Sequence, residues 1–245
     1  MESNTSDLPW DDIKDDSGSF DTILVGFCDI SYAGIRVISG LMNNDEASYQ
    51  TGNLFFTTNG SEEEGGKVGF LQVTSPVPAF EATGLACRLV DGLTLLSPHR
   101  VIVVGAARLP EALEAGVLYA TDMSGWQDEE TIREFPSDVS LNDPMIGALY
   151  QYLYVSSLSS SFLIWPGYRL REHQFLDPET IQHISLAGNF LSKTVGKLNR
   201  FNAEKVLELG VNSWQATGDD TRHHENSSIG VKSGESYNEF LPTYI

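Results

Sequence analysis

Short uninterrupted apolar runs alternate along the chain with segments in which apolar residues recur every three or four positions. The runs at residues 23–27, 101–105 and 162–165 are typical of strands that are buried on both faces. Residues 53–57 and 68–73 are two further strand candidates. The pattern therefore predicts a sheet with apolar layers packed on both of its sides.

Helical spacing fills the intervals between these runs. Two of the helices begin with an Asp-Pro pair, Asp143-Pro144 and Asp177-Pro178, in which Asp acts as the N-cap and Pro takes the first helical position. The predicted helices lie around residues 35–42, 85–90, 146–153, 181–195 and 202–214.

This alternation predicts one α/β domain over residues 21–216, with three layers and a mostly parallel central sheet covered by helices. Residues 1–20 are rich in Asp and are expected to form a flexible acidic tail. Residues 217–245 are expected to form a flexible linker that ends in a docking motif, because their Gly, Ser, Asn and Asp content gives way to six apolar-rich residues.

The charge balance narrows the possible partners. The chain carries 34 Asp and Glu against 15 Lys and Arg, a formal net charge of -19. A net anion repels nucleic acid and anionic lipid, so we expect neither as a partner. The sequence shows no signal-peptide pattern and no apolar run of bilayer length, and its two cysteines cannot build a disulfide framework. These features favour a cytoplasmic and nuclear protein.

Signatures of catalysis are missing from the sequence. We find no Walker-type loop, no G-x-G-x-x-G after a strand, no G-x-S-x-G elbow and no H-E-x-x-H. Cys28 follows a predicted strand, where α/β enzymes place reactive groups, but no histidine spacing ties a base to it. We favour a small buried hydrophobe over a nucleophile. The five histidines are His99, His173, His183, His223 and His224.

Three polar residues allow an alternative, enzymatic interpretation. Ser75, Arg108 and Arg169 each follow an apolar run, and the ends of parallel strands border a ligand crevice. Two guanidinium groups could hold a phosphate or carboxylate there, as in a nucleoside-phosphorylase type of enzyme. We favour the other interpretation, in which each Arg pairs with the abundant surface acids.

We expect no metal ion and no cofactor. His223 and His224 stand beside Asp219, Asp220 and Glu225, but a linker offers no fixed ligand geometry.

Aromatic residues suggest protein contacts. Trp165 ends a strand, and the sequence leaves open whether it completes the core or belongs to a partner surface. Tyr150, Tyr152 and Tyr154 share a helix, and Tyr152 cannot point in the direction of the apolar face. We therefore expect some exposed aromatic surface on this helix.

The C-terminal residues Thr243, Tyr244 and Ile245 form the most distinctive candidate site. They bring a free carboxylate, a ring and a hydroxyl to the end of the predicted linker. The carboxylate requires a Lys or Arg, and the ring requires a narrow apolar slot, which together describe a partner-binding motif. The alternative is a frayed end or a return strand that packs on the domain.

The chain resembles the proteasome assembly chaperones of the 20S core particle. The resemblance lies in an α/β body of this size, an acidic sequence without catalytic signature and a C-terminal hydrophobic-Tyr-X tail. Residues 143–147, 162–167 and 177–179 are similar to a helix-strand-helix segment of the chaperone 1 branch. Residues 72–76 and 100–104 are similar to segments shared with the chaperone 2 branch. The likeness is strongest to chaperone 1.

The resemblance implies a non-enzymatic chaperone that forms a heterodimer with a related subunit and sits on the proteasome α-ring. Its tail would enter a pocket between α-subunits, with the carboxylate of Ile245 on a Lys and with Tyr244 beside it. Thr243 stands where the family prefers an apolar side chain, so one contact of the motif is reduced to a methyl group.

Overall fold

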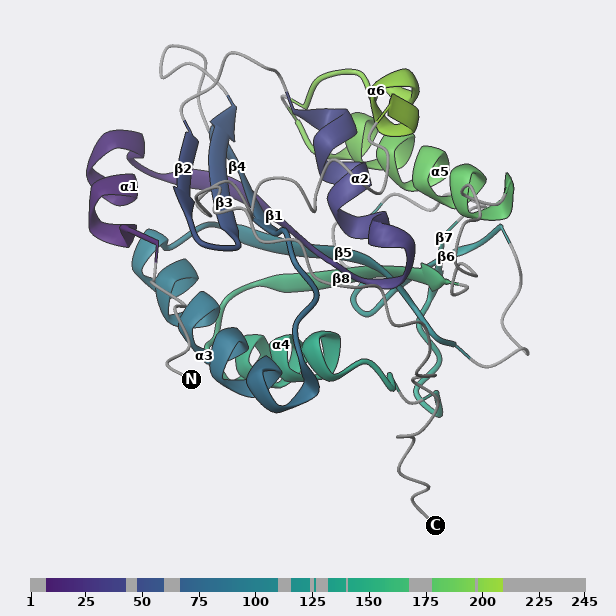
Figure 1. Cartoon of the computed structure of the whole chain (residues 1–245), viewed down its shortest axis with the longest axis horizontal. Helices are drawn as coiled ribbons and strands as arrows, with labels where there is room; N and C mark the ends of the chain where they lie inside the picture. The colour runs from purple at the N-terminus through teal and green to yellow at the C-terminus, as the bar shows by residue number, and fades with distance from the viewer. Residues whose placement is uncertain are drawn as a thin grey trace, which may run out of the picture.

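The strands form one eight-stranded sheet in a computed structural model of the chain (Figure 1). The structure describes residues 8–42, 48–59, 67–109, 116–123, 126, 132–139, 141–167, 178–196 and 198–208. The strand order is β2-β3-β4-β1-β5-β8-β6-β7. The strands are β1 Phe20–Phe27, β2 Ser48–Thr51, β3 Leu54–Asn59, β4 Lys67–Val73, β5 Arg100–Ala107, β6 Leu118–Ala120, β7 Ile132–Glu134 and β8 Ser160–Pro166.

The four central strands are parallel. β1 pairs with β4 on one side and β5 on the other, and β5 pairs with β8, so that Val25 lies opposite both Leu71 and Val103. Antiparallel pairing is confined to the margins, where β3 joins β2 to β4 and β6 joins β8. The prediction of an α/β domain with a mostly parallel, helix-covered sheet is confirmed.

Helices cover both faces of this sheet (Figure 1). α3 and α4 pack together on one face, with α1 against α3, and α2, α5 and α6 pack on the other. The helices are α1 Trp10–Ser17, α2 Ala33–Leu41, α3 Ala79–Leu96, α4 Pro144–Val155, α5 Pro178–Thr194 and α6 Ala203–Glu208, with a 3-10 turn, η1 Ile30–Tyr32, before α2.

The continuous apolar runs fill two separate cores. Because successive strand residues point to opposite faces, Ile23 and Val103 pack with α3 and α4, whereas Leu24 and Val104 pack with α2 and α5. All four side chains are buried. This two-sided burial explains why the central strands are apolar at every position.

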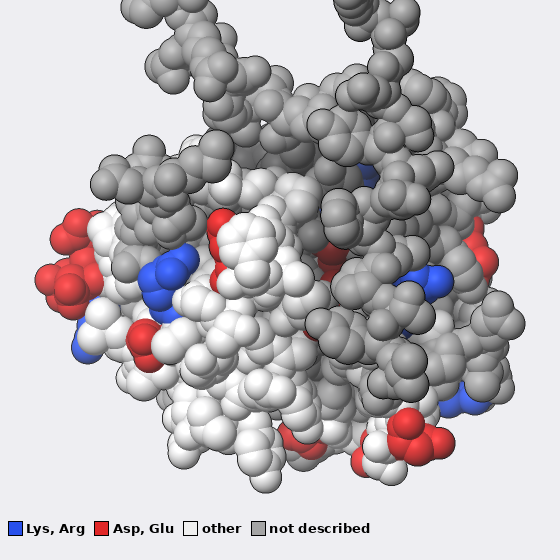
Figure 2. All heavy atoms as spheres, turned by 60° about the horizontal axis from the view of Figure 1, so that its bottom comes forward, with Lys and Arg blue, Asp and Glu red and all other residues white. Residues whose placement is uncertain are grey.

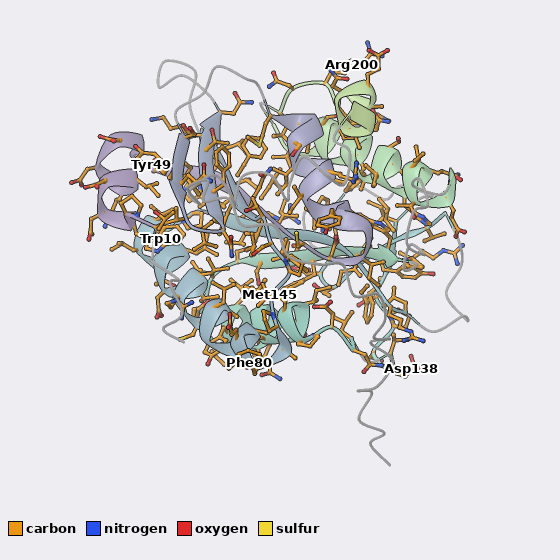
Figure 3. The ribbon with its side chains drawn as sticks, in the orientation of Figure 1. Trp10, Tyr49, Phe80, Asp138, Met145 and Arg200 are labelled. Carbon is orange, nitrogen blue, oxygen red and sulfur yellow. The ribbon has the colours of Figure 1, made fainter. Side chains whose placement is uncertain are left out.

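The flexible tail predicted for residues 1–20 is wrong for residues 8–20. Residues 10–17 form the helix α1, and Leu8 and Ile13 are buried in the core on the α3 side. The Trp10 ring meets Phe56 edge to face at 6.3 Å, and the hydroxyl of Tyr49 donates to Asp16 at 2.6 Å. Figure 3 shows Trp10 and Tyr49 beside this helix. Leu8, just before the helix, and Trp10 and Ile13, three positions apart within it, therefore outweigh the acidic composition.

Phe201 and Arg36 attach the last described helix to the body. The ring of Phe201 fills a slot between α2 and α5, where a Cβ at Gly40 or Gly188 would collide with it. The guanidinium of Arg36, buried in α2, donates to the carbonyl oxygen of Val206 at 2.8 Å. Both contacts bring the end of the domain to the α2–α5 side of the sheet.

We expect the substitution Phe201→Ala to lower the free energy of unfolding by about 3–5 kcal/mol, because it leaves a cavity that the two helices cannot close. The matched control is Phe80→Ala on α3, whose side chain is exposed and should change stability by no more than about 0.5 kcal/mol. Urea denaturation of both variants measures the difference. Equal losses in the two variants would contradict the packing role of Phe201.

Candidate functional site

The carboxyl ends of the central strands bring together several residues that the sequence singles out. Ser75 follows β4, Cys28 and Asp29 follow β1, and Arg108 follows β5. Because β1 lies between β4 and β5, the serine and the arginine stand two strands apart, about 10 Å, on either side of Asp29. Arg169 lies outside the described residues.

Asp29 occupies the position where open α/β sheets bind their ligands. The connection after β1 leads through α2 toward β4, whereas the connection after β5 leads the other way toward β8, so the strand order switches between β1 and β5. The Asp29 carboxylate accepts from the backbone N–H of Gly34, at 3.1 and 3.3 Å to its two oxygens, and from that of Ala106 at 2.5 Å. It thus joins the start of α2 to the end of β5 across this switch point.

The chain packs closely around Asp29. A Cβ at Gly34 would collide with the carbonyl oxygen of Val104, and a Cβ at Gly105 would come within 2.8 Å of the Asp29 carboxylate. In phosphate-binding folds, free N–H groups at a helix start receive the anion of the ligand. Here the amide of Gly34 already donates to the carboxyl group of Asp29 in the same chain.

The electrostatic environment at this edge is acidic. Burial raises the pKa of the Asp29 carboxyl well above its usual range, the amides of Ala106, Gly34 and Ala33 oppose that shift, and the negative charge of Asp143 adds to it. Asp143 itself caps α4, because its Oδ1 accepts from the amides of Met145 and Ile146 at 2.9 Å. A raised pKa favours the protonated, uncharged form of the Asp29 carboxyl group.

Cys28 lacks the environment of a nucleophile. Burial, together with the neighbouring Asp29, raises the pKa of its thiol to about 12. His99 cannot serve as its base, because its amide bonds to Phe20 at the opposite end of β1, about 26 Å away. His183 is buried in α5, where its Nδ1 lies 3.0 Å from the carbonyl oxygen of Glu179 and its Nε2 accepts from Gly116. His173, His223 and His224 lie outside the described residues.

Ser75 lines a small cavity rather than a crevice of substrate size. Thr51, Asn53, Glu81 and Arg88 are among its other lining residues, and its volume is about 50 Å³. Ligand pockets measure roughly 300–1,000 Å³. The cavity that contains Ser75 therefore has no room for a nucleoside, and Arg108 is exposed at the other side of Asp29.

The structure also decides the open questions on the aromatic residues. Trp165 is fully buried in the core on the α2–α5 side, so it completes the core. The expectation of exposed aromatic surface on α4 is confirmed for Tyr150 and Tyr154. It is wrong for Tyr152, whose side chain is half-buried. Tyr152 packs against the core on the α3 side because its position lies at the flank of the helix that faces α3 and the sheet.

Two predicted features cannot be placed. The docking motif Thr243, Tyr244 and Ile245 and the histidine pair of the linker lie outside the described residues. Within the described residues no three His, Cys, Asp or Glu side chains are arranged so that they could hold a metal ion. Among the described helices, none is both long and apolar enough to cross a bilayer.

We expect the substitution Asp29→Ala to lower the free energy of unfolding by about 2–4 kcal/mol, because the buried amides of Gly34 and Ala106 lose their acceptor. Asp21→Ala is the matched control, since Asp21 is exposed and pairs with the exposed His99 at 3.3 Å, which predicts a change within about 0.5 kcal/mol. Thermal denaturation of the two variants checks this. A stable Asp29→Ala protein would show that the carboxylate does not join the two elements.

The thiol of Cys28 is expected to react slowly. In a Cys87→Ala variant Cys28 is the single thiol, and a pKa of about 12 in place of 9.0 lowers its thiolate fraction at pH 8 about 1,000-fold. Alkylation by iodoacetamide should therefore be at least about 100-fold slower in the folded than in the urea-unfolded variant, and should still accelerate above pH 9. A fast reaction at pH 7 would instead support a nucleophile.

No protein-family model matches the chain, and no curated protein matches it significantly. Solved structures do share its fold. PbaA of Pyrococcus furiosus, an archaeal homolog of proteasome-assembly chaperone, aligns with a TM-score of 0.52 over 81% of this chain and 91% of that chain, at 14% identity. A Thermoplasma acidophilum protein of unknown function aligns with a TM-score of 0.54 over 81% and 86%, at 11% identity.

Purine nucleoside phosphorylase of Schistosoma mansoni in complex with adenosine aligns with a TM-score of only 0.47, over 78% of this chain and 95% of that chain at 13% identity. An alignment with this TM-score does not establish a shared fold. The fold of this chain is thus one that it shares with a homolog of proteasome-assembly chaperone.

Proposed function

We propose that the chain is a non-enzymatic assembly chaperone of the 20S proteasome core particle, most like proteasome assembly chaperone 1. It acts as a heterodimer with a related chaperone subunit on the α-ring. Its C-terminal Tyr-containing tail docks into a pocket of an α-subunit. It works in the cytoplasm and nucleus, without a cofactor and without nucleic acid or membrane as a partner.

The observation that carries this proposal is the set of contacts that Asp29 makes at the switch point. In a fold shared with PbaA, the position that binds ligands in enzymes of this architecture is held by Asp29, with backbone contacts too close for a side chain at Gly34 or Gly105. The reactive group nearest to it in sequence, Cys28, has a thiol that stays protonated. These features support a body that presents surfaces rather than one that converts a substrate.

The acidic charge of the chain fits the proposed docking partner. A formal net charge of -19 favours approach to lysine-containing pockets and opposes approach to phosphate backbones and anionic lipids. In the tail, the carboxylate of Ile245 pairs with a pocket Lys, and Tyr244 fills the adjacent slot. Thr243 contributes its methyl group to the same contact.

We expect the variant Tyr244→Ala to lose α-subunits at least about 10-fold in affinity purification, because the ring is the largest group of the docking motif. The matched control is Tyr237→Ala, which removes the same ring seven residues earlier in the same tail and should leave recovery unchanged. Both variants should retain the second chaperone subunit. Quantitative mass spectrometry of the purified complexes gives the two recoveries.

Two outcomes contradict the proposal. If the unaltered chain recovers neither proteasome α-subunits nor a second chaperone subunit, the assembly role is wrong. If Tyr244→Ala and Tyr237→Ala lose α-subunits equally, the terminal motif is not the docking element.

A further inference from the structure

The outer surface of the α3–α4 layer carries the largest exposed apolar side chains of the described residues. Phe80 on α3 is 84% exposed, and Tyr154, Val155 and Tyr150 on α4 are 78%, 73% and 42% exposed. Both helices turn their buried sides toward the same face of the sheet, so their exposed residues form one outer surface. We call this surface, with Phe80, Thr83, Gly84, Tyr150, Gln151, Tyr154 and Val155, the α3–α4 face.

Charge is nearly absent from this face. α4 contains no Asp, Glu, Lys or Arg among its 12 residues, and the first two turns of α3 contain only the half-buried Glu81. The half-buried Arg88 and the exposed Asp91 lie further along α3, beyond the residues that define the face. Figure 2 shows this layer turned toward the viewer as a broad area without charged side chains, which lie mainly around its margin. In a chain with a formal charge of -19, this is a distinct surface.

The tyrosines of α4 are held in place before any partner arrives. The rings of Tyr150 and Tyr154 stack with centroids 6.4 Å apart and an interplanar angle of 18°. Tyr150 also meets the buried Phe162 edge to face at 5.4 Å, which fixes the pair to the core. Aromatic side chains ordered in this way lose little entropy on binding and are enriched at protein interfaces.

The size of the face suits a protein rather than a small molecule. α3 has 18 residues and is thus about 27 Å long, and two packed helices lie about 8–10 Å apart. Over the length of α4, which has 12 residues and is about 18 Å long, their outer surface covers on the order of 350 Å² in projection, and more in accessible area. A standard interface buries about 800 Å² per partner. Phe80 marks one end of this area, in the first turn of α3, and is labelled in Figure 3 on the outer side of the layer from Met145.

We propose that the α3–α4 face binds the second chaperone subunit of the heterodimer, through a surface of that subunit that is itself apolar and uncharged. This inference rests on the proposed function. An uncharged partner surface follows from the face, because a charge buried against Tyr154 and Val155 would lose its water without gaining a counter-ion. A second copy of this chain is disfavoured, since it would add another formal charge of -19 to the complex.

A pair of isosteric substitutions tests the surface. Gln151→Glu places one negative charge on the α3–α4 face, and Gln182→Glu places one on the exposed side of α5, in the opposite layer. We expect Gln151→Glu to reduce recovery of the second subunit about 10-fold or more relative to Gln182→Glu. Removal of the ring in Tyr154→Ala should reduce recovery in the same direction. Thermal denaturation of the variants verifies that all of them remain folded.

A photo-crosslinking amino acid identifies the occupant directly. Placed at Tyr154 in the full chain, it should crosslink to a second chaperone subunit that mass spectrometry identifies, and placed at Gln182 it should not. Crosslinks from Tyr154 to an α-subunit or to another copy of this chain would overturn the inference, as would equal recovery with Gln151→Glu and Gln182→Glu. In each of these cases, continued loss of α-subunits in Tyr244→Ala would leave the proposed function standing.

Discussion

The hydrogen bonds of the Asp29 carboxylate hold together the centre of the molecule. β1 is the strand that joins the two directions of the sheet, and Asp29 fixes the turn after it to α2 on one side and to β5 on the other. Gly34 and Gly105 bring the backbones so close that no side chain fits between them. The position of α2, and through α2 that of α5 and α6, depends on this contact.

Asp29 also makes contacts at the switch point, the position where other open α/β sheets bind their ligands. The carboxyl group of Asp29 belongs to the chain itself, so it is present at every concentration of any metabolite. A bound ligand stabilises the folded state by an amount that depends on the ligand concentration. The contacts of Asp29 stabilise the folded state by an amount that does not vary in this way. Such a constant shape fits the scaffold role that we propose.

Much of the fold followed from the sequence because its central strands are apolar on both faces. Residues 23–27, 68–73, 101–105 and 162–165 each lie within an observed strand, and Asp143-Pro144 begins α4 with the predicted capping bonds. These signals are local. Each depends on residues within one element, so neither distant contacts nor the packing of other segments can obscure them.

The remaining parts depended on contacts between distant segments. β2 is a polar edge strand, and β6 and β7 have three residues each, too few to show a period. The acidic α1 is ordered because Trp10 and Ile13 reach the core beside α3. The sequence placed Cys28 and Asp29 after a strand but gave Asp29 no role, because its partners Gly34 and Ala106 are backbone amides, and Ala106 is 77 residues away. Tyr154 could not be distinguished from Tyr152 without the orientation of α4.

Phe201 and Arg36 attach α6 to the α2–α5 side of the sheet, opposite the α3–α4 face. Under the proposed function, the chain attaches to the particle at two places, by its tail and through the subunit that binds the α3–α4 face. Two attachments to one particle make the second an intramolecular event, with an effective concentration of about a millimolar for a short flexible linker. A tail with Thr243 in place of an apolar residue can then be weak by itself and still selective. Under the proposed function, such a tail would bind only where a pocket and a docked body coincide, and it would leave an isolated α-subunit largely unbound.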